Sequence, residues 1–233
     1  MIVSNSKKFI FSHIPKAGGS TLSRILSIHA GSAPIVIAGD YLEKEHSTQF
    51  YNHDCMCTPI TNDHRQPSWL YGHHVPMRDV KYIKLEDYFK FAFTRNPFDR
   101  LVSIWEIPFI KFKYPFSDFI KVDTTEEMKL AWSIRTQYDI VSDDNGLLLD
   151  YVGKYENLED DFEYVRKKLD IPKKILLDRY NNNRKAVDYN NLPYVNKNIN
   201  KDHDNYREYY NTKTRNLVEK YYKKDLETFE YEF

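Results

Sequence analysis

The sequence lacks several features that would mark out common classes of protein. Its 233 residues include only two cysteines, Cys55 and Cys57, which do not suggest a disulfide framework. Neither sign of charge is in excess, because 34 Lys and Arg balance 34 Asp and Glu. No global basic field therefore argues for nucleic acid or a membrane surface as a partner. No apolar run approaches the roughly 20 residues of a membrane span, and residues 1–8 lack a signal-peptide pattern. We expect a soluble, cytoplasmic protein.

What is present predicts a single α/β domain over residues 1–233. Aromatic residues are plentiful, with 19 Tyr and 14 Phe, so extensive disorder is not expected. Apolar runs predict strands, and stripes at helical spacing predict helices. The strands are expected at 8–14, 34–38, 88–93 and 151–155, and the helices start near Ser20, Pro97, Leu158 and Thr212. This alternation predicts a parallel sheet covered on both faces.

The remaining segments are predicted less sharply. The last helix is expected over 212–229, with Leu217, Tyr221 and Leu226 buried. Residues 39–68 are polar and mixed, 109–138 are expected to be helical in parts, and 180–204 are expected to form a loop.

One turn stands out, in the stretch HIPKAGGSTL at residues 13–22. A strand, a turn with Gly18 and Gly19, and a helix start together favour an anion site, because the first N–H groups of a helix have no intrahelical partner. Lys16 adds a positive charge, and Ser20 and Thr21 add hydroxyl donors. The alternative is an ordinary connection with a solvated lysine. The turn does not match the G-x-x-x-x-G-K-[ST] pattern of nucleotide hydrolases, which disfavours an enzyme that uses ATP or GTP.

A second candidate half-site follows the strand at 88–93, in the stretch FAFTRNPFDRLVSIW. Arg95 at the end of the strand can bind a phosphate bidentately, and Ser103 on the following helix can add a hydroxyl. The alternative is that Arg95 only pairs locally with Asp99.

Together the two stretches resemble the sulfotransferases that use 3′-phosphoadenosine 5′-phosphosulfate (PAPS), in the carbohydrate branch that includes the heparan sulfate 2-O enzymes. LLLDYVGKYENLEDDF at 147–162 resembles a further element of that family. The resemblance implies a P-loop NTPase-like three-layer sandwich with a central parallel sheet. It implies PAPS as donor, PAP as product, no metal, and a hydroxyl acceptor, expected to be a saccharide. Because this chain shows no N-terminal membrane anchor, a bacterial or viral origin is expected.

The resemblance also assigns residues to roles. Lys16, Ala17, Gly18, Gly19, Ser20 and Thr21 would cradle the 5′-phosphosulfate, with Lys16 also catalytic, and Arg95 and Ser103 would hold the 3′-phosphate. Tyr155 would stack near the adenine, and Lys201 would close over the nucleotide; a core tyrosine and a solvated lysine are the alternatives.

The general base is expected in the stretch YGHHVPMRDV, where His74 corresponds to the base of the 2-O-sulfotransferases. The spacing is shifted, so His73 stays a competitor, and a pair of structural histidines is a third possibility. A zinc site at His53, Cys55, Cys57 and His64 is less favoured than isolated thiols. The alternative functions are a nucleotide kinase and a nucleotide-binding module without transferase activity.

Overall fold

The protein is described here from a computed structural model, which covers residues 1–4, 7–29, 35–36, 76–79, 84–121, 134–172, 174–176, 186–188 and 205–233. Its main sheet has the strand order β3-β1-β2-β4-β7. The strands are β1 (Ile2–Ser4), β2 (Phe9–Ser12), β3 (Ile35–Val36), β4 (Phe89–Thr94) and β7 (Tyr151–Lys154). In the described chain β2, β4 and β7 pair in parallel, whereas β1 is antiparallel to both of its neighbours.

The antiparallel β1 corrects the expectation of a purely parallel sheet. Only residues 5–8 connect β1 to β2, and Ile2 lies opposite Phe11 in the resulting pair. A connection this short can join only antiparallel strands, since a parallel crossover needs a dozen or more residues. The sheet is therefore mixed, with most of its strands running in one direction.

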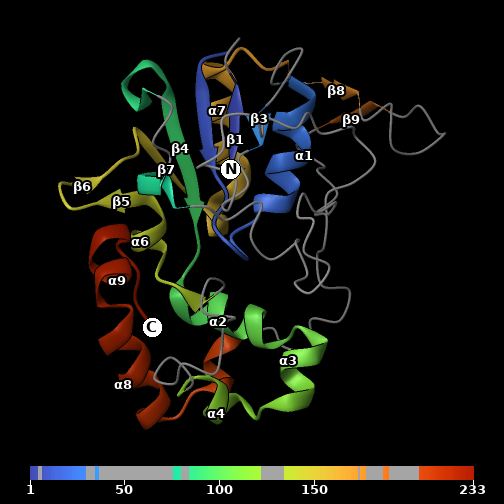
Figure 1. Ribbon diagram of the computed structural model, residues 1–233. Coiled ribbons are helices and arrows are strands. Elements are labelled where there is room, and N and C mark those ends of the chain that lie inside the picture. The colour runs from blue at the N-terminus through green and yellow to red at the C-terminus, as the bar shows by residue number, and fades with distance from the viewer. Residues whose placement is uncertain are drawn as a thin grey trace, which may run out of the picture.

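Helices cover both faces of this sheet, as expected (Figure 1). Every second side chain of β2 and β4 packs against α1 (Gly19–His29) and α7 (Leu158–Lys168). These side chains are Phe9, Phe11, Phe91 and Phe93. The intervening residues, Ile10 and Ala92, face α6 (Gln137–Val141) and the end of α9 (Lys223–Phe229). The alternation follows from the two-residue period of a strand. It explains why each strand reads as a continuous apolar run.

A helical layer lies beyond the carboxyl ends of the strands (Figure 1). It contains α2 (Pro97–Trp105), α3 (Pro108–Lys113), α4 (Phe116–Phe119) and α8 (Thr212–Tyr221) around an aromatic core. The start of α2 lies where the sequence predicted it: Pro97 is the first helical residue, and Asn96 Oδ1 accepts the N–H of Phe98 as the cap. These are the residue types that favour a helix start.

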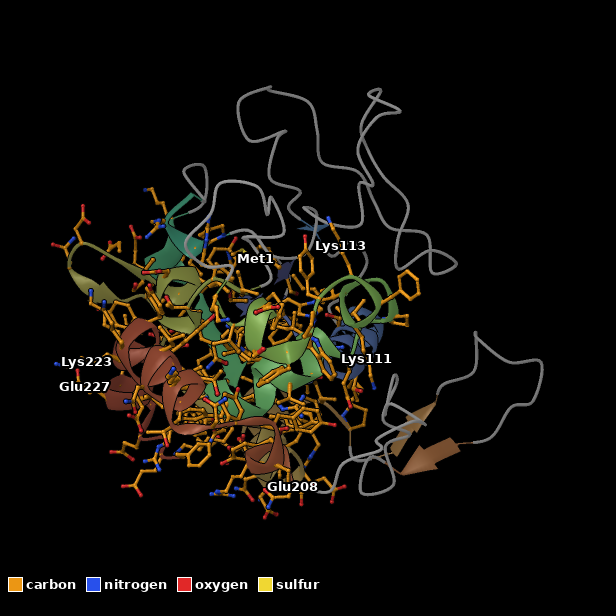
Figure 2. All side chains as sticks on the ribbon, turned by 90° about the horizontal axis from the view of Figure 1, so that it is seen from below. Met1, Lys111, Lys113, Glu208, Lys223 and Glu227 are labelled. Atoms are coloured by element: carbon orange, nitrogen blue, oxygen red, sulfur yellow. The ribbon has the colours of Figure 1, made fainter. Side chains whose placement is uncertain are left out.

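The predicted last helix is two helices, α8 and α9, which meet at Tyr222. Its buried residues are Thr214, Val218, Tyr222, Asp225 and Phe229, whereas Leu217, Tyr221 and Leu226 are only half-buried beside them. The hydroxyl of the buried Tyr222 donates to the carbonyl of Ile134. Leu217 and Tyr221 each lie one residue before a buried position, and Leu226 lies one residue after one. On the opposite side of α9, Lys223 and Glu227 lie at the edge of the molecule (Figure 2).

The remaining described elements are short strand pairs and 3-10 helices. Two small antiparallel pairs are β5 (Ser142–Asp143) with β6 (Gly146–Leu147), and β8 (Lys174–Leu176) with β9 (Ala186–Asp188). The strand β9 falls within the segment 180–204 that was expected to be a loop, so that prediction was wrong for these three residues. The 3-10 helices are η3 (Met77–Asp79), η4 (Leu85–Asp87), η6 (Tyr155–Asn157) and η8 (Tyr206–Tyr209).

Candidate functional site

Three segments of the candidate site emerge from one edge of the sheet. The turn at residues 13–18 follows β2, Arg95 and Asn96 follow β4, and Tyr155 follows β7. Because these strands are adjacent and parallel, their carboxyl ends meet at the same edge, which is where open α/β sheets bind ligands. The fold thus brings together stretches that lie about 80 and 60 residues apart in the sequence.

The turn after β2 has an unusual backbone conformation. Lys16 and Gly18 both have positive φ, 64° and 80°, and α1 begins at Gly19. An added Cβ would lie 2.0 Å from the ring of His13 at Gly19, which excludes a side chain there, and 3.0 Å from the ring of Tyr155 at Gly18, where the positive φ also disfavours one. Packing against these two rings therefore accounts for both glycines, and the turn leads directly into the start of α1, where an anion site would lie.

Arg95 joins the two halves of the candidate site. Its side chain is buried, and its Nη1 donates to the backbone carbonyl of Lys16 at 3.0 Å. Its Nε donates to Asp99 Oδ2 at 2.7 Å, so the local pairing that the sequence left open is present. Nη2 lies equally close to that oxygen, but no acceptor among the described residues takes a hydrogen bond from it. This buried nitrogen therefore keeps donor capacity that suits an anion.

Tyr155 lies between Arg95 and the turn. The guanidinium of Arg95 stacks over its ring at 4.4 Å from the centroid, and the edge of the ring faces Gly18. One face of this ring is thus occupied by Arg95, which stabilises the guanidinium by a cation–π contact. Tyr155 contacts both predicted phosphate-binding segments.

Lys16 sits in an environment that disfavours its charge. Burial lowers the pKa of Lys16 from the ordinary 10.5, the positive charge of Arg95 lowers it further, and the carboxylate of Glu106 partly offsets both. Desolvation and a like charge both penalise the ammonium form. An anionic ligand beside Lys16 would again favour its ammonium form, so the residues present fit a phosphate or sulfate group.

A second arginine, Arg100, also supports the turn. It is fully buried on α2, and it donates to the carbonyl of Pro15 at 3.4 Å and to that of Arg135 at 2.6 Å. Arg95 and Arg100 thus hold two consecutive carbonyls of the turn, those of Lys16 and Pro15. Arg100 was not among the residues predicted from the sequence, although it lies inside the FTRNPFDRLVS stretch.

The structure describes some of the other predicted residues but not all of them. Ala17 and Thr21 are buried in the turn and the first turn of α1, and Ser103 is buried on α2. Ser20 belongs to α1. His73, His74 and Lys201 lie outside the described residues, as do His53, Cys55, Cys57 and His64.

Within the described part of the chain, no group of three or more His, Cys, Asp or Glu side chains is arranged to hold a metal ion. None of its helices is long and apolar enough to cross a membrane.

Comparison with known proteins gives one match. A family model described as the Sulfotransferase family matches residues 1–232. Searches of curated proteins and of solved structures found no significant match.

Proposed function

The chain belongs to the sulfotransferase family, and from this premise we propose that it transfers a sulfuryl group from PAPS to a hydroxyl group, expected to be on a saccharide. The observation that carries the proposal is the bond between Arg95 Nη1 and the carbonyl of Lys16. It joins the turn that would hold the 5′-phosphosulfate to the segment that would hold the 3′-phosphate. Two phosphate sites in contact suit a donor nucleotide that is phosphorylated at both positions.

The proposed roles follow from where charge changes during transfer. The bond between sulfur and the bridging oxygen breaks, and a bond forms between sulfur and the acceptor oxygen. Negative charge builds on the departing oxygen of PAP, where the ammonium of Lys16 and the amides that open α1 would stabilise it. The turn of residues 16–21 would bind the 5′ group, and Arg95 with Ser103 would bind the 3′-phosphate. Tyr155 and Lys201 would complete the nucleotide site.

The acceptor hydroxyl must lose its proton as the new bond forms. We assign this role to His74, with His73 as the competitor, because histidine has an ordinary pKa near 6.5 and suits a general base. The proton passes to the imidazole, so protons and charge are balanced without a metal ion.

The donor assignment predicts a difference between two nucleotides in thermal unfolding. PAP should raise the melting temperature markedly, because a ligand that binds only the folded state stabilises it by mass action. Adenosine 5′-phosphate should raise it much less at the same concentration, since it lacks the 3′-phosphate. Differential scanning calorimetry of the whole chain measures both shifts. Equal shifts from the two nucleotides would remove Arg95 and Ser103 from their proposed role.

The lowered pKa of Lys16 predicts the basic side of the pH–rate profile. Lys16 acts as a cation, and a lowered pKa means that the cation is lost as pH rises through a value below 10.5. We therefore expect kcat/KM, which reports the free enzyme, to fall as pH rises through that value. In kcat the fall should come at higher pH, because the bound anionic donor favours the ammonium form.

The matched variant for this profile is Lys16→Arg, whose guanidinium stays protonated throughout. The basic limb should disappear from its kcat/KM profile even if the absolute rate is lower. A basic limb that is unchanged in Lys16→Arg would show that another group titrates.

A further inference from the structure

The side chain of Gln137 makes a reciprocal pair of hydrogen bonds with the backbone of Arg95. Gln137 Oε1 accepts the N–H of Arg95 at 2.9 Å, and Gln137 Nε2 donates to the carbonyl of Arg95 at 2.8 Å. Gln137 is fully buried, and it stands 42 residues from Arg95 in the sequence. Both backbone groups of Arg95 are thus satisfied by one amide at the point where β4 ends.

The amide is itself held in place from a third part of the chain. The buried Asp225 of α9 accepts the backbone N–H of Gln137 through Oδ2 and that of Tyr138 through Oδ1, both at 2.8 Å. A carboxylate at the first amides of a helix is a favourable cap. Thr136 Oγ1 accepts the N–H of Asp139 and fixes the same turn. The start of α6 is therefore rigidly defined, and the direction of the Gln137 side chain with it.

The position of the Arg95 backbone decides where its guanidinium can reach. That guanidinium must at once meet the carbonyl of Lys16, the carboxylate of Asp99 and the ring of Tyr155. The neighbours of Arg95 are held by other groups: Thr94 Oγ1 contacts the hydroxyl of Tyr231 at 3.0 Å, and the N–H of Asn96 donates to Glu156 at 2.7 Å. Gln137 holds the backbone of Arg95 itself.

We propose that Gln137 is a positioning residue for the 3′-phosphate: through the backbone of Arg95 it sets the guanidinium in the place where that phosphate binds. The inference rests on the proposed function, because it assumes that Arg95 binds the 3′-phosphate. Gln137 thereby favours binding of PAP over AMP, although it does not contact the nucleotide.

The test is the ratio of the dissociation constants for AMP and PAP, measured by calorimetry on the whole chain. Gln137→Met conserves length and volume but removes both hydrogen bonds. We expect the affinity for PAP to fall about tenfold or more, since two buried backbone groups lose their partners. The affinity for AMP should fall less, because Arg100 still holds the turn at the carbonyl of Pro15, so the preference for PAP weakens. Tyr138→Phe, a change at the next residue of α6 that leaves the Gln137 amide in place, should keep the wild-type ratio.

A double-mutant cycle asks whether Gln137 acts through Arg95. Arg95→Met should by itself abolish the preference for PAP, and adding Gln137→Met to it should then change the ratio no further. Independent effects would instead add. An additive double variant would overturn the proposal.

Gln137→Glu supplies a test that does not depend on how Gln137→Met folds. At neutral pH the carboxylate accepts the N–H of Arg95 but faces its carbonyl without a proton to donate. When protonated, the acid again offers one donor and one acceptor. The preference of Gln137→Glu for PAP should therefore be weak at pH 7.5 and recover toward the wild-type ratio as pH falls to about 5. The wild-type protein, measured with the same ligands, corrects for titration of the phosphates.

The outcomes separate the inference from the proposed function. If the wild-type chain binds AMP and PAP equally, the proposed function fails before any variant is measured. If the wild-type chain prefers PAP and Gln137→Met prefers it equally, only the inference fails. If Gln137→Met does not fold, Gln137→Glu decides, and a ratio that does not recover at low pH overturns the inference.

Discussion

Lys16→Ala should lower kcat by about two to three orders of magnitude, the usual effect of removing one group that stabilises charge in the transition state. The dissociation constant for PAP should change far less, because the charge that Lys16 meets develops only as the sulfur–oxygen bond breaks. Steady-state kinetics gives the first quantity and calorimetry the second. The variant should keep the geometry of the site, since Arg95 bonds the backbone carbonyl of Lys16 and not its side chain.

The matched control for Lys16→Ala is Lys84→Ala, which removes an exposed lysine before η4. Its kcat and its PAP affinity should match those of the wild-type chain. A loss in Lys16→Ala that is confined to PAP affinity would make Lys16 a binding residue and remove it from the chemical step.

His74→Ala should lower the rate by roughly two to four orders of magnitude, which is the usual contribution of general-base catalysis. PAP binding should survive, because the proposed phosphate contacts come from other segments. The variant should also lose the acid limb of its pH–rate profile, since that limb reports protonation of the base. A full profile of kcat/KM against pH for the wild-type chain and the variant measures both effects.

The neighbouring residue provides the control for this assignment. Successive side chains of an extended segment point to opposite sides, so His73→Ala should change the rate much less than His74→Ala. The order of the two variants is decisive. A large loss in His73→Ala with a mild effect in His74→Ala would transfer the role of base to His73.

The local structure around the candidate site could be predicted because its signals are local in the sequence. Asn96 and Pro97 are residue types that favour a helix start, and in the structure they are the cap and the first helical residue of α2. Gly19 stands where the ring of His13 leaves no room for a side chain, and Gly18 has positive φ and packs closely on the ring of Tyr155. A strand, a turn and a helix within about 20 residues leave a pattern that is readable without tertiary structure.

What the sequence could not indicate depends on contacts between distant segments. Nothing near Gln137 in the chain marks it as the partner of Arg95, because both of its bonds go to the backbone of a residue 42 positions away. At the break between α8 and α9, Tyr222 bonds the carbonyl of Ile134 and lies beside Arg100, whereas the helical pattern of the sequence continues through this residue. The antiparallel β1 was missed because three residues are too short to show a periodicity.

The left-handed backbone of Lys16 has a consequence for the evolution of this chain. At φ 64° a residue with a Cβ atom costs roughly 1–2 kcal/mol that glycine would not. Selection for folding stability alone would therefore favour glycine at this position and would also remove a partly buried cation. Lys8, Asp170 and Glu230 also have positive φ, but at Lys16 this cost adds to that of a partly buried cation, which the proposed benefit to the reaction would offset. A descendant of this protein released from catalysis should accordingly lose Lys16 early, while the buried arginines that hold the turn together persist for the sake of the fold.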